Sequence, residues 1–338
     1  MRTIAKWILP AYLSAAAAAF AGDPTPAKAA DRYSTRCRPH GPSRINDEQG
    51  SMLSGMFSGW TDQERRRGDD RKTVLMAASL DGLVQGPAGV KSLSLQGGRL
   101  EGSPNLVGAV LQGTDSEGQP VEVAICGAEP SAKDPDTMWY RIEAWNPISQ
   151  EWDNPCVPTG AVPAPRALVL SGTWDAGGAR HDAPGKVTFA CENGVLSKCV
   201  GWGYKPWATR NGRSLAEAHQ ACTRMARADY CGDGTSHTRQ GNRIDYYDSL
   251  GIGARTPGAP PDWLFEAAWR PDGASCIGRT RDGRPLESVL QECPGRFKPG
   301  AADLGDGDRC VVQRADAAGS PPVLRNRSPV SKRAFSVP

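Results

Sequence analysis

The sequence predicts a mainly β protein of α+β type, in which a small antiparallel β domain precedes a second domain built from a β-hairpin and a helix. Short segments rich in Val, Leu, Ile and aromatic residues alternate with Gly and Pro, which is typical of strands and turns. The 338 residues include 39 Gly and 28 Pro, a composition that opposes long helices. Ten cysteines add a disulfide framework to this prediction.

The first residues have the layout of a secretory signal peptide, expected at 1–21. Arg2 and Lys6 precede an apolar run over 7–20, and Ala19-Phe20-Ala21 provides a small-x-small cleavage pattern. A retained membrane anchor is the alternative, but the run is short for a bilayer, and we expect no transmembrane span after leader removal. The predicted location is extracytoplasmic: periplasm, cell surface or secreted. Loss of Arg2 and Lys6 lowers the formal charge from +3 to +1, so no nucleic-acid partner is expected.

The front half divides into an arm and a β domain. Residues 22–71 mix Pro, Gly, Ser and charges and predict a linker or loosely packed arm, which Cys37 could tie down. Residues 72–160 predict the small β domain. Its expected strands lie at 74–78, 92–95, 107–111, 121–125 and 139–145.

A Pro-rich joint at 158–165 leads to the second predicted domain, 166–298. Strands at 186–191 and 195–202 flank Asn193-Gly194, a strong signal for a two-residue hairpin turn. Ser214 and Glu217 have the spacing of a capping box. Apolar residues then recur at helical intervals, which predicts a helix that ends near Ala228.

The cysteines are expected to form disulfides, because they are even in number and the chain is expected to be exported. A two-residue turn at Asn193-Gly194 would place Cys191 and Cys199 on opposite faces of the hairpin. We therefore expect at least one of them to bond to Cys222 or Cys231. The cysteines expected in disulfides are Cys126, Cys156, Cys191, Cys199, Cys222, Cys231, Cys276 and Cys293.

One block of the second predicted domain resembles a known domain family. Residues 222–234, in which Ala-Asp-Tyr-Cys stands at 228–231, resemble the ADYC-domain family of exported bacterial proteins, together with residues 198–207 upstream and 244–248 downstream. The similarity covers roughly 166–293. It implies export and a domain type, and it implies no reaction, because the family has no established activity.

Four side chains near this block are candidates for catalysis, because a histidine beside a carboxylate can act as a general base. They are His219, Asp229, Asp233 and His237. Packing or turn formation is the competing interpretation, since the chain has none of the G-x-S-x-G, H-E-x-x-H or phosphate-loop motifs. The turn also lacks the third and twelfth ligands of a calcium loop, and no cysteine pair has C-x-x-C spacing. No metal and no cofactor are therefore expected.

Three aromatic residues are candidates for binding: Trp202, Tyr204 and Trp207. The Gly and Pro between them break the alternation that would bury all three, so an exposed aromatic surface is expected if they bind a ligand. The competing interpretation is that they belong to the core.

Residues 299–338 are rich in Gly, Ala, Asp, Pro, Ser and Arg, which predicts a low-complexity and largely disordered tail. The sequence as a whole favours a disulfide-stabilised cell-envelope or secreted protein with a binding or structural role. Its expected partner is an envelope polysaccharide or protein. The alternative is an extracytoplasmic hydrolase that uses His237 or His219 with Asp229 or Asp233.

Overall fold

The computed structural model describes most of the chain that follows the predicted signal peptide. The described residues are 32–38, 52–53, 73–74, 77–87, 90, 92–102, 105–114, 120–146, 150–156, 162–175, 177–238, 242–316 and 323–330. The predicted signal peptide lies outside them. The fold is mainly β and antiparallel, as predicted.

Six strands close into an antiparallel barrel in which each strand pairs with the next along the chain, and the last pairs with the first. The pairing of β8 with β10, at Tyr140 and Ala167, is the contact that closes the sheet into a barrel. The barrel strands are β3 (Ala77–Gln85), β6 (Val110–Thr114), β7 (Pro120–Pro130), β8 (Met138–Asn146), β10 (Ala167–Ser171) and β13 (Lys186–Cys191).

Two additions decorate the barrel. The hairpin of β4 (Ser94–Gln96) and β5 (Arg99–Glu101) is inserted between β3 and β6, and β9 (Glu151–Asp153) extends the sheet beyond β8. The remaining short strands form three two-stranded pairs. They are β1 (Met52–Leu53) with β2 (Thr73–Val74), β11 (Thr173–Trp174) with β12 (Arg180–His181), and β14 (Thr209–Arg210) with β15 (Arg213–Ser214).

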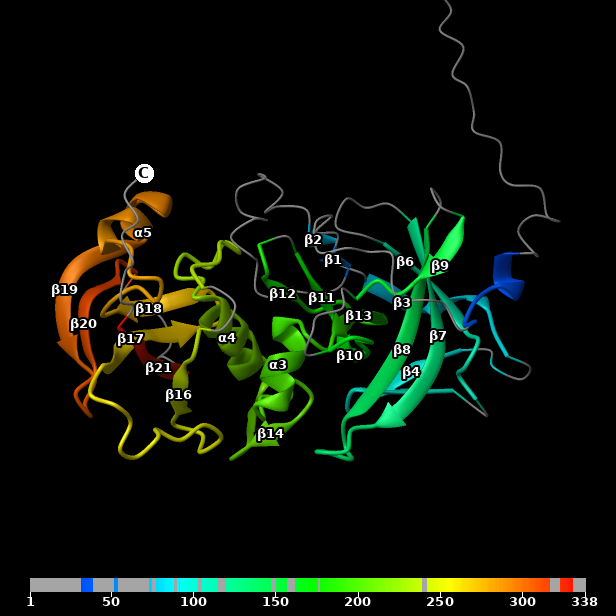
Figure 1. Cartoon of the computed structure of the whole chain (residues 1–338), viewed down its shortest axis with the longest axis horizontal. Helices are drawn as coiled ribbons and strands as arrows, with labels where there is room; N and C mark the ends of the chain where they lie inside the picture. Colours follow the sequence, from blue (N-terminus) through cyan, green and yellow to red (C-terminus); the bar gives the residue numbers. More distant parts are fainter. Residues whose placement is uncertain are drawn as a thin grey trace, which may run out of the picture.

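A second antiparallel sheet has the order β16-β21-β17-β18-β20-β19. Its strands are β16 (Asp245–Asp248), β17 (Trp263–Arg270), β18 (Gly273–Ile277), β19 (Phe297–Asp303), β20 (Arg309–Arg314) and β21 (Leu324–Pro329). Three helices accompany it: α3 (Val195–Gly201), α4 (Ala216–Arg227) and α5 (Leu286–Glu292). In Figure 1 the barrel lies at the right, the second sheet at the left, and α3 and α4 between them.

Strands β10 and β13 form a wall shared by two cores. Val169 and Phe189 point into the barrel, whereas Leu168, Leu170 and Ala190 pack against α3 and α4 on the other face. A strand buried on both faces has a continuous apolar run, and Ala167–Leu170 has this pattern. The Pro-rich joint expected at 158–165 therefore lies between β9 and β10 of one sheet and does not separate the two sheets.

The predicted hairpin at Asn193-Gly194 is wrong, because residues 195–201 form α3. The buried positions of this segment include Val195, Leu196, Cys199 and Val200, which is helical spacing. Gly194 is the helix N-cap with extended backbone angles. The predicted helix is present as α4 and ends at Arg227, close to the expected position, although Leu215 rather than Ser214 is its N-cap.

The expected disorder after residue 299 is also wrong for the described part of the tail, which contributes β19, β20 and β21. Polar residues of β21 face inward, and Asn326 and Ser328 are fully buried. Trp269 Nε1 donates to Asn326 Oδ1 at 2.7 Å, and Asn326 Nδ2 donates to Glu266 at 2.9 Å. Hydrogen bonds between buried polar groups stabilise such a strand. Its sequence therefore lacks the apolar pattern from which strands are predicted.

All ten cysteines are paired in five disulfides: Cys37–Cys126, Cys156–Cys191, Cys199–Cys222, Cys231–Cys293 and Cys276–Cys310. Cys37 thus ties the N-terminal arm to β7, as anticipated. Cys199–Cys222 is one of the pairs that the sequence allowed, but it joins α3 to α4 rather than a hairpin to a helix.

Candidate functional site at the barrel mouth

The Ala-Asp-Tyr-Cys block forms the turn that follows α4, and we call residues 228–234 the signature turn. Ala228 is the helix C-cap in the left-handed conformation, with φ 52°. Its N–H donates to Met225 O at 3.0 Å, and the Asp229 N–H donates to Arg224 O at 2.9 Å. The chain thereby satisfies the terminal carbonyls of the helix and reverses direction.

Asp229 organises this turn from its centre. Its buried carboxylate pairs with Arg224 Nη1 at 2.5 Å, and the guanidinium is itself only 2% exposed. The same carboxylate accepts the backbone N–H groups of Gly232, Asp233 and Gly234 at 2.8–3.2 Å. Gly232 has φ 72°, and a Cβ there would lie 1.9 Å from Asp272 O, so only glycine fits. Asp229 therefore holds the turn and has no free edge for a substrate.

Tyr230 and Cys231 anchor the signature turn to the second sheet. The Tyr230 ring stacks on Trp269 with centroids 5.4 Å apart, and its hydroxyl donates to Glu266 at 3.2 Å. Glu266 also receives two hydrogen bonds from Arg281, whose other donors cap the carbonyls of Met225 and Ala226. Cys231 bonds to Cys293 after α5. Asp229, Tyr230 and Cys231 thus each have a structural contact that accounts for their identity, whereas the left-handed conformation of Ala228 does not by itself favour alanine.

The two candidate histidines are buried at separate places. His219 Nε2 lies 3.0 Å from Leu196 O, its ring meets the edge of Trp174, and Nδ1 has no partner among the described residues. Burial lowers the pKa of His219 to about 4, so the ring is neutral near pH 7. His219 is a core residue in this arrangement.

His237 contacts the carbonyl of Ala228 through Nδ1 at 2.9 Å and the carboxylate of Glu292 through Nε2 at 2.5 Å. The hydrogen bond from His237 is the main reason why the pKa of Glu292 lies below its usual value. Asp233 is exposed and accepts the N–H of Thr235. Among the described residues, neither histidine shares a hydrogen bond with Asp229 or Asp233, so the four candidates do not converge.

The three candidate aromatic residues also have packing partners. Trp202 is half-buried and stacks on Tyr246 at 4.8 Å, and Tyr204 is fully buried with its hydroxyl 2.6 Å from Asp248. Trp207 packs over the turn of the β4–β5 hairpin, where a Cβ added to Gly98 would lie within 2.9 Å of its ring. The described part of the chain does not present these rings as an exposed aromatic surface.

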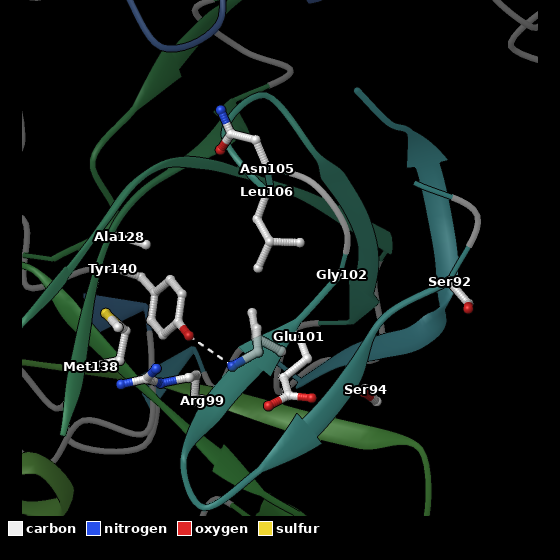
Figure 2. A pocket seen from close by; sticks show the side chains of 11 residues that line it. Ser92, Ser94, Arg99, Glu101, Gly102, Asn105, Leu106, Ala128, Met138 and Tyr140 are labelled. Atoms are coloured by element: carbon white, nitrogen blue, oxygen red, sulfur yellow. Dashed lines mark hydrogen bonds between the residues drawn. The ribbon is translucent and has the colours of Figure 1, made fainter. Parts of the chain in front are cut away.

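A pocket of 660 Å³ opens at one end of the barrel, and its residues carry no sequence motif. This volume is within the range of small-molecule sites, which often lie at the mouths of β-barrels. Figure 2 shows its lining side chains around a central hollow. They come from the β4–β5 hairpin, the segment before β6 and the adjoining ends of β7 and β8: Ser92, Ser94, Arg99, Leu100, Glu101, Gly102, Asn105, Leu106, Ala128, Met138 and Tyr140.

Tyr140 forms the buried wall of this barrel-mouth pocket. Its hydroxyl accepts the N–H of Leu100 at 2.7 Å, which fixes the β4–β5 hairpin across the barrel end (Figure 2). Burial raises the pKa of Tyr140, the Leu100 N–H and Arg99 oppose the rise, and Glu101 adds to it. Both charges therefore act on the same hydroxyl at the pocket wall.

Arg99 and Glu101 lie on one face of β5, because side chains alternate along a strand. Both are exposed, and neither side chain makes a hydrogen bond or ion pair within the part of the chain that the structure describes. They are therefore available to a ligand. The sequence signal that could have located them is Gly97-Gly98, a two-residue turn with positive φ at both positions.

The segment before α4 holds both walls of the pocket in place. Trp207 covers the tip of the β4–β5 hairpin at Gly98, and Lys205 Nζ lies 2.6 Å from Asp134 in the β7–β8 connection. The second half of the chain thus supports the pocket without lining it.

Metal ligands are grouped at one place in the described residues, where Cys37, Cys126 and Glu143 lie within 4.8 Å of one another. The two sulfurs are bonded to each other, so they offer no thiolate to a metal. None of the described helices has the length and apolarity that crossing a bilayer requires.

The match to a family model places the chain in a class. The ADYC domain model matches residues 103–283, more than half of the chain, and the chain therefore belongs to the ADYC-domain family. The match begins within the barrel, well before the segment from 166 on which the sequence resemblance rested. Searches among curated proteins and among solved structures returned no significant match.

Proposed function

We propose that this ADYC-domain protein is an exported binding component of the cell envelope or a secreted binding protein, and that it holds its ligand in the barrel-mouth pocket. The observation that carries the proposal is the contrast in partners. Among the described residues, the exposed side chains of Arg99 and Glu101 at the pocket have no partner, whereas Asp229 and Glu266 at the signature turn are paired with Arg224 and Arg281. Five disulfides support an oxidising compartment.

The hydrolase alternative has less support. General base catalysis needs a histidine or carboxylate within reach of the reacting proton. His219 and Asp229 are fully buried, and His237 is occupied at both nitrogens. A binding function needs only a pocket with polar groups that can contact a ligand, and the barrel-mouth pocket has these in Arg99 and Glu101.

The test is retention of small molecules from an envelope extract, followed by mass spectrometry of what the purified chain holds. The matched variant is Ala128→Trp, which fills the pocket from its exposed rim on β7. We expect the wild type to retain compounds that the variant does not. Equal retention by both, or retention by neither, would contradict the proposal.

A further inference from the structure

The chemistry of the barrel-mouth pocket restricts the ligand, and this inference rests on the proposed function. The pocket combines a guanidinium, a carboxylate and an apolar surface. Arg99 and Glu101 supply the charges, and Leu100, Leu106, Met138 and the ring of Tyr140 supply the apolar part. A ligand that fits all three needs a negative group, a positive group and an apolar body.

The two charged residues project from the same face of β5, so one small ligand can contact both. Two steps along a strand separate the Cα atoms of Arg99 and Glu101 by about 7 Å. Their exposed side chains can turn toward a group that lies between them. An α-amino acid carries its ammonium and its carboxylate on neighbouring atoms and can therefore pair with both residues.

The free state of the two side chains supports the same conclusion. An arginine and a glutamate on the same face of a strand could pair with each other, yet no ion pair joins them in the structure. Both influence the Tyr140 hydroxyl, so both charges act at the wall of the pocket. Figure 2 shows Arg99 and Glu101 as separate groups along the lower edge of the hollow.

We infer that the pocket binds a free α-amino acid with an apolar side chain. Arg99 receives the carboxylate, Glu101 receives the ammonium, and the apolar side chain lies against Leu106 and Tyr140. Ser92, Ser94 and Asn105 supply further polar groups at the rim. A neutral polysaccharide would leave both charges without a partner, which makes it the poorer fit.

Calorimetric titration of the full disulfide-bonded chain tests this inference with L-leucine and L-phenylalanine as probes. N-acetyl-leucine and leucine amide each lack one charge. We expect either blocked form to bind at least tenfold more weakly than leucine. Glu101→Gln should weaken leucine at least tenfold but leave N-acetyl-leucine unchanged, and Arg99→Gln should do the same for leucine and leucine amide.

Matched controls are Glu287→Gln on α5 and Arg309→Gln on β20, both exposed and on the second sheet's side of the molecule. They should bind leucine as the wild type does. Failure of both amino acids to bind, or equal binding of the blocked forms, overturns the inference. If the wild type still retains extract compounds that Ala128→Trp does not, the amino-acid class is wrong and the binding function stands. If the wild type and Ala128→Trp also do not differ in the compounds that they retain, both the amino-acid class and the binding function are wrong.

Discussion

The signature turn and the barrel-mouth pocket both contain charged side chains, and the two regions treat them in opposite ways. At the signature turn Asp229, Arg224, Glu266 and Arg281 are buried, and each has an oppositely charged partner within 3 Å. At the pocket Arg99 and Glu101 are exposed and have none among the described residues. A buried charge must be paired to be tolerated, whereas an exposed unpaired charge beside a hollow is free to act.

The comparison separates the part of the sequence that is easiest to recognise from the part that is available for binding. The Ala-Asp-Tyr-Cys block is recognisable because a carboxylate among three N–H groups, a stacked ring and a disulfide each favour a particular residue. The pocket demands only suitable groups around a space. A strong motif can therefore mark a fold requirement rather than a site.

The largest expected effect is that of Asp229→Ala. If this substitution did not lower the stability, the assignment of the signature turn to stability would be wrong. The substitution leaves Arg224 buried without its partner and three N–H groups without an acceptor. We expect a loss of about 3 to 5 kcal/mol in the free energy of unfolding, measured by urea denaturation. Asp233→Ala, in the same turn but exposed, is the control and should unfold like the wild type. Equal stability of the two variants would refute a structural role for Asp229.

A smaller effect is expected from His219 as the pH falls. Its folded pKa of about 4 is below the value of about 6.5 in an unfolded chain, so the unfolded state takes up the proton first. The stability that this neutral histidine provides is complete above pH 6.5 and is lost progressively toward pH 4. At pH 5 the loss is about 2 kcal/mol relative to pH 7.

His219→Gln isolates that contribution, because the amide can still donate to Leu196 O and does not titrate. Urea unfolding at pH 7 and pH 5 should show a smaller pH effect in the variant than in the wild type, by about 2 kcal/mol. An identical pH dependence in both proteins would mean that His219 is not the buried neutral group described here.

A local effect is expected at the pocket when its outside support is removed. Trp207→Ala uncovers the β4–β5 turn at Gly98. Amide hydrogen exchange over 94–101 should become at least about tenfold faster, while the signature turn keeps its protection. Trp263→Ala, at a half-buried position on the second sheet, is the control. Unchanged exchange over 94–101 would show that the hairpin needs no support from Trp207.

The sequence predicted the elements whose pattern is local. The strand at 186–191 agrees with β13, and the α4 helix follows from its apolar spacing and ends close to the predicted Ala228. The segment 195–202 was wrongly predicted as a strand, because Val and Cys in a short apolar run after Asn-Gly suit a strand as well as a helix. Its assignment as a helix depends on packing against α4, where Cys199 meets Cys222.

The remaining features depend on contacts between distant segments. β21 is polar in sequence, and only Trp269 and Glu266 from β17 make its inward Asn326 favourable. The pocket forms because barrel closure brings Tyr140 of β8 beneath Leu100 of the inserted hairpin. Spacing along the chain contains neither fact, so sequence patterns indicated Trp202, Tyr204 and Trp207 as binding candidates instead of the pocket residues.

One pair of isosteric substitutions tests the central contrast most directly. Glu266→Gln changes a buried carboxylate that accepts from Arg281, Tyr230 and Asn326, and Glu101→Gln changes an exposed one at the pocket. Urea unfolding of both variants beside the wild type should show a loss of about 3 kcal/mol or more for Glu266→Gln and no measurable loss for Glu101→Gln. Comparable losses in both, or a stable Glu266→Gln protein, would contradict the assignment of one region to stability and the other to binding.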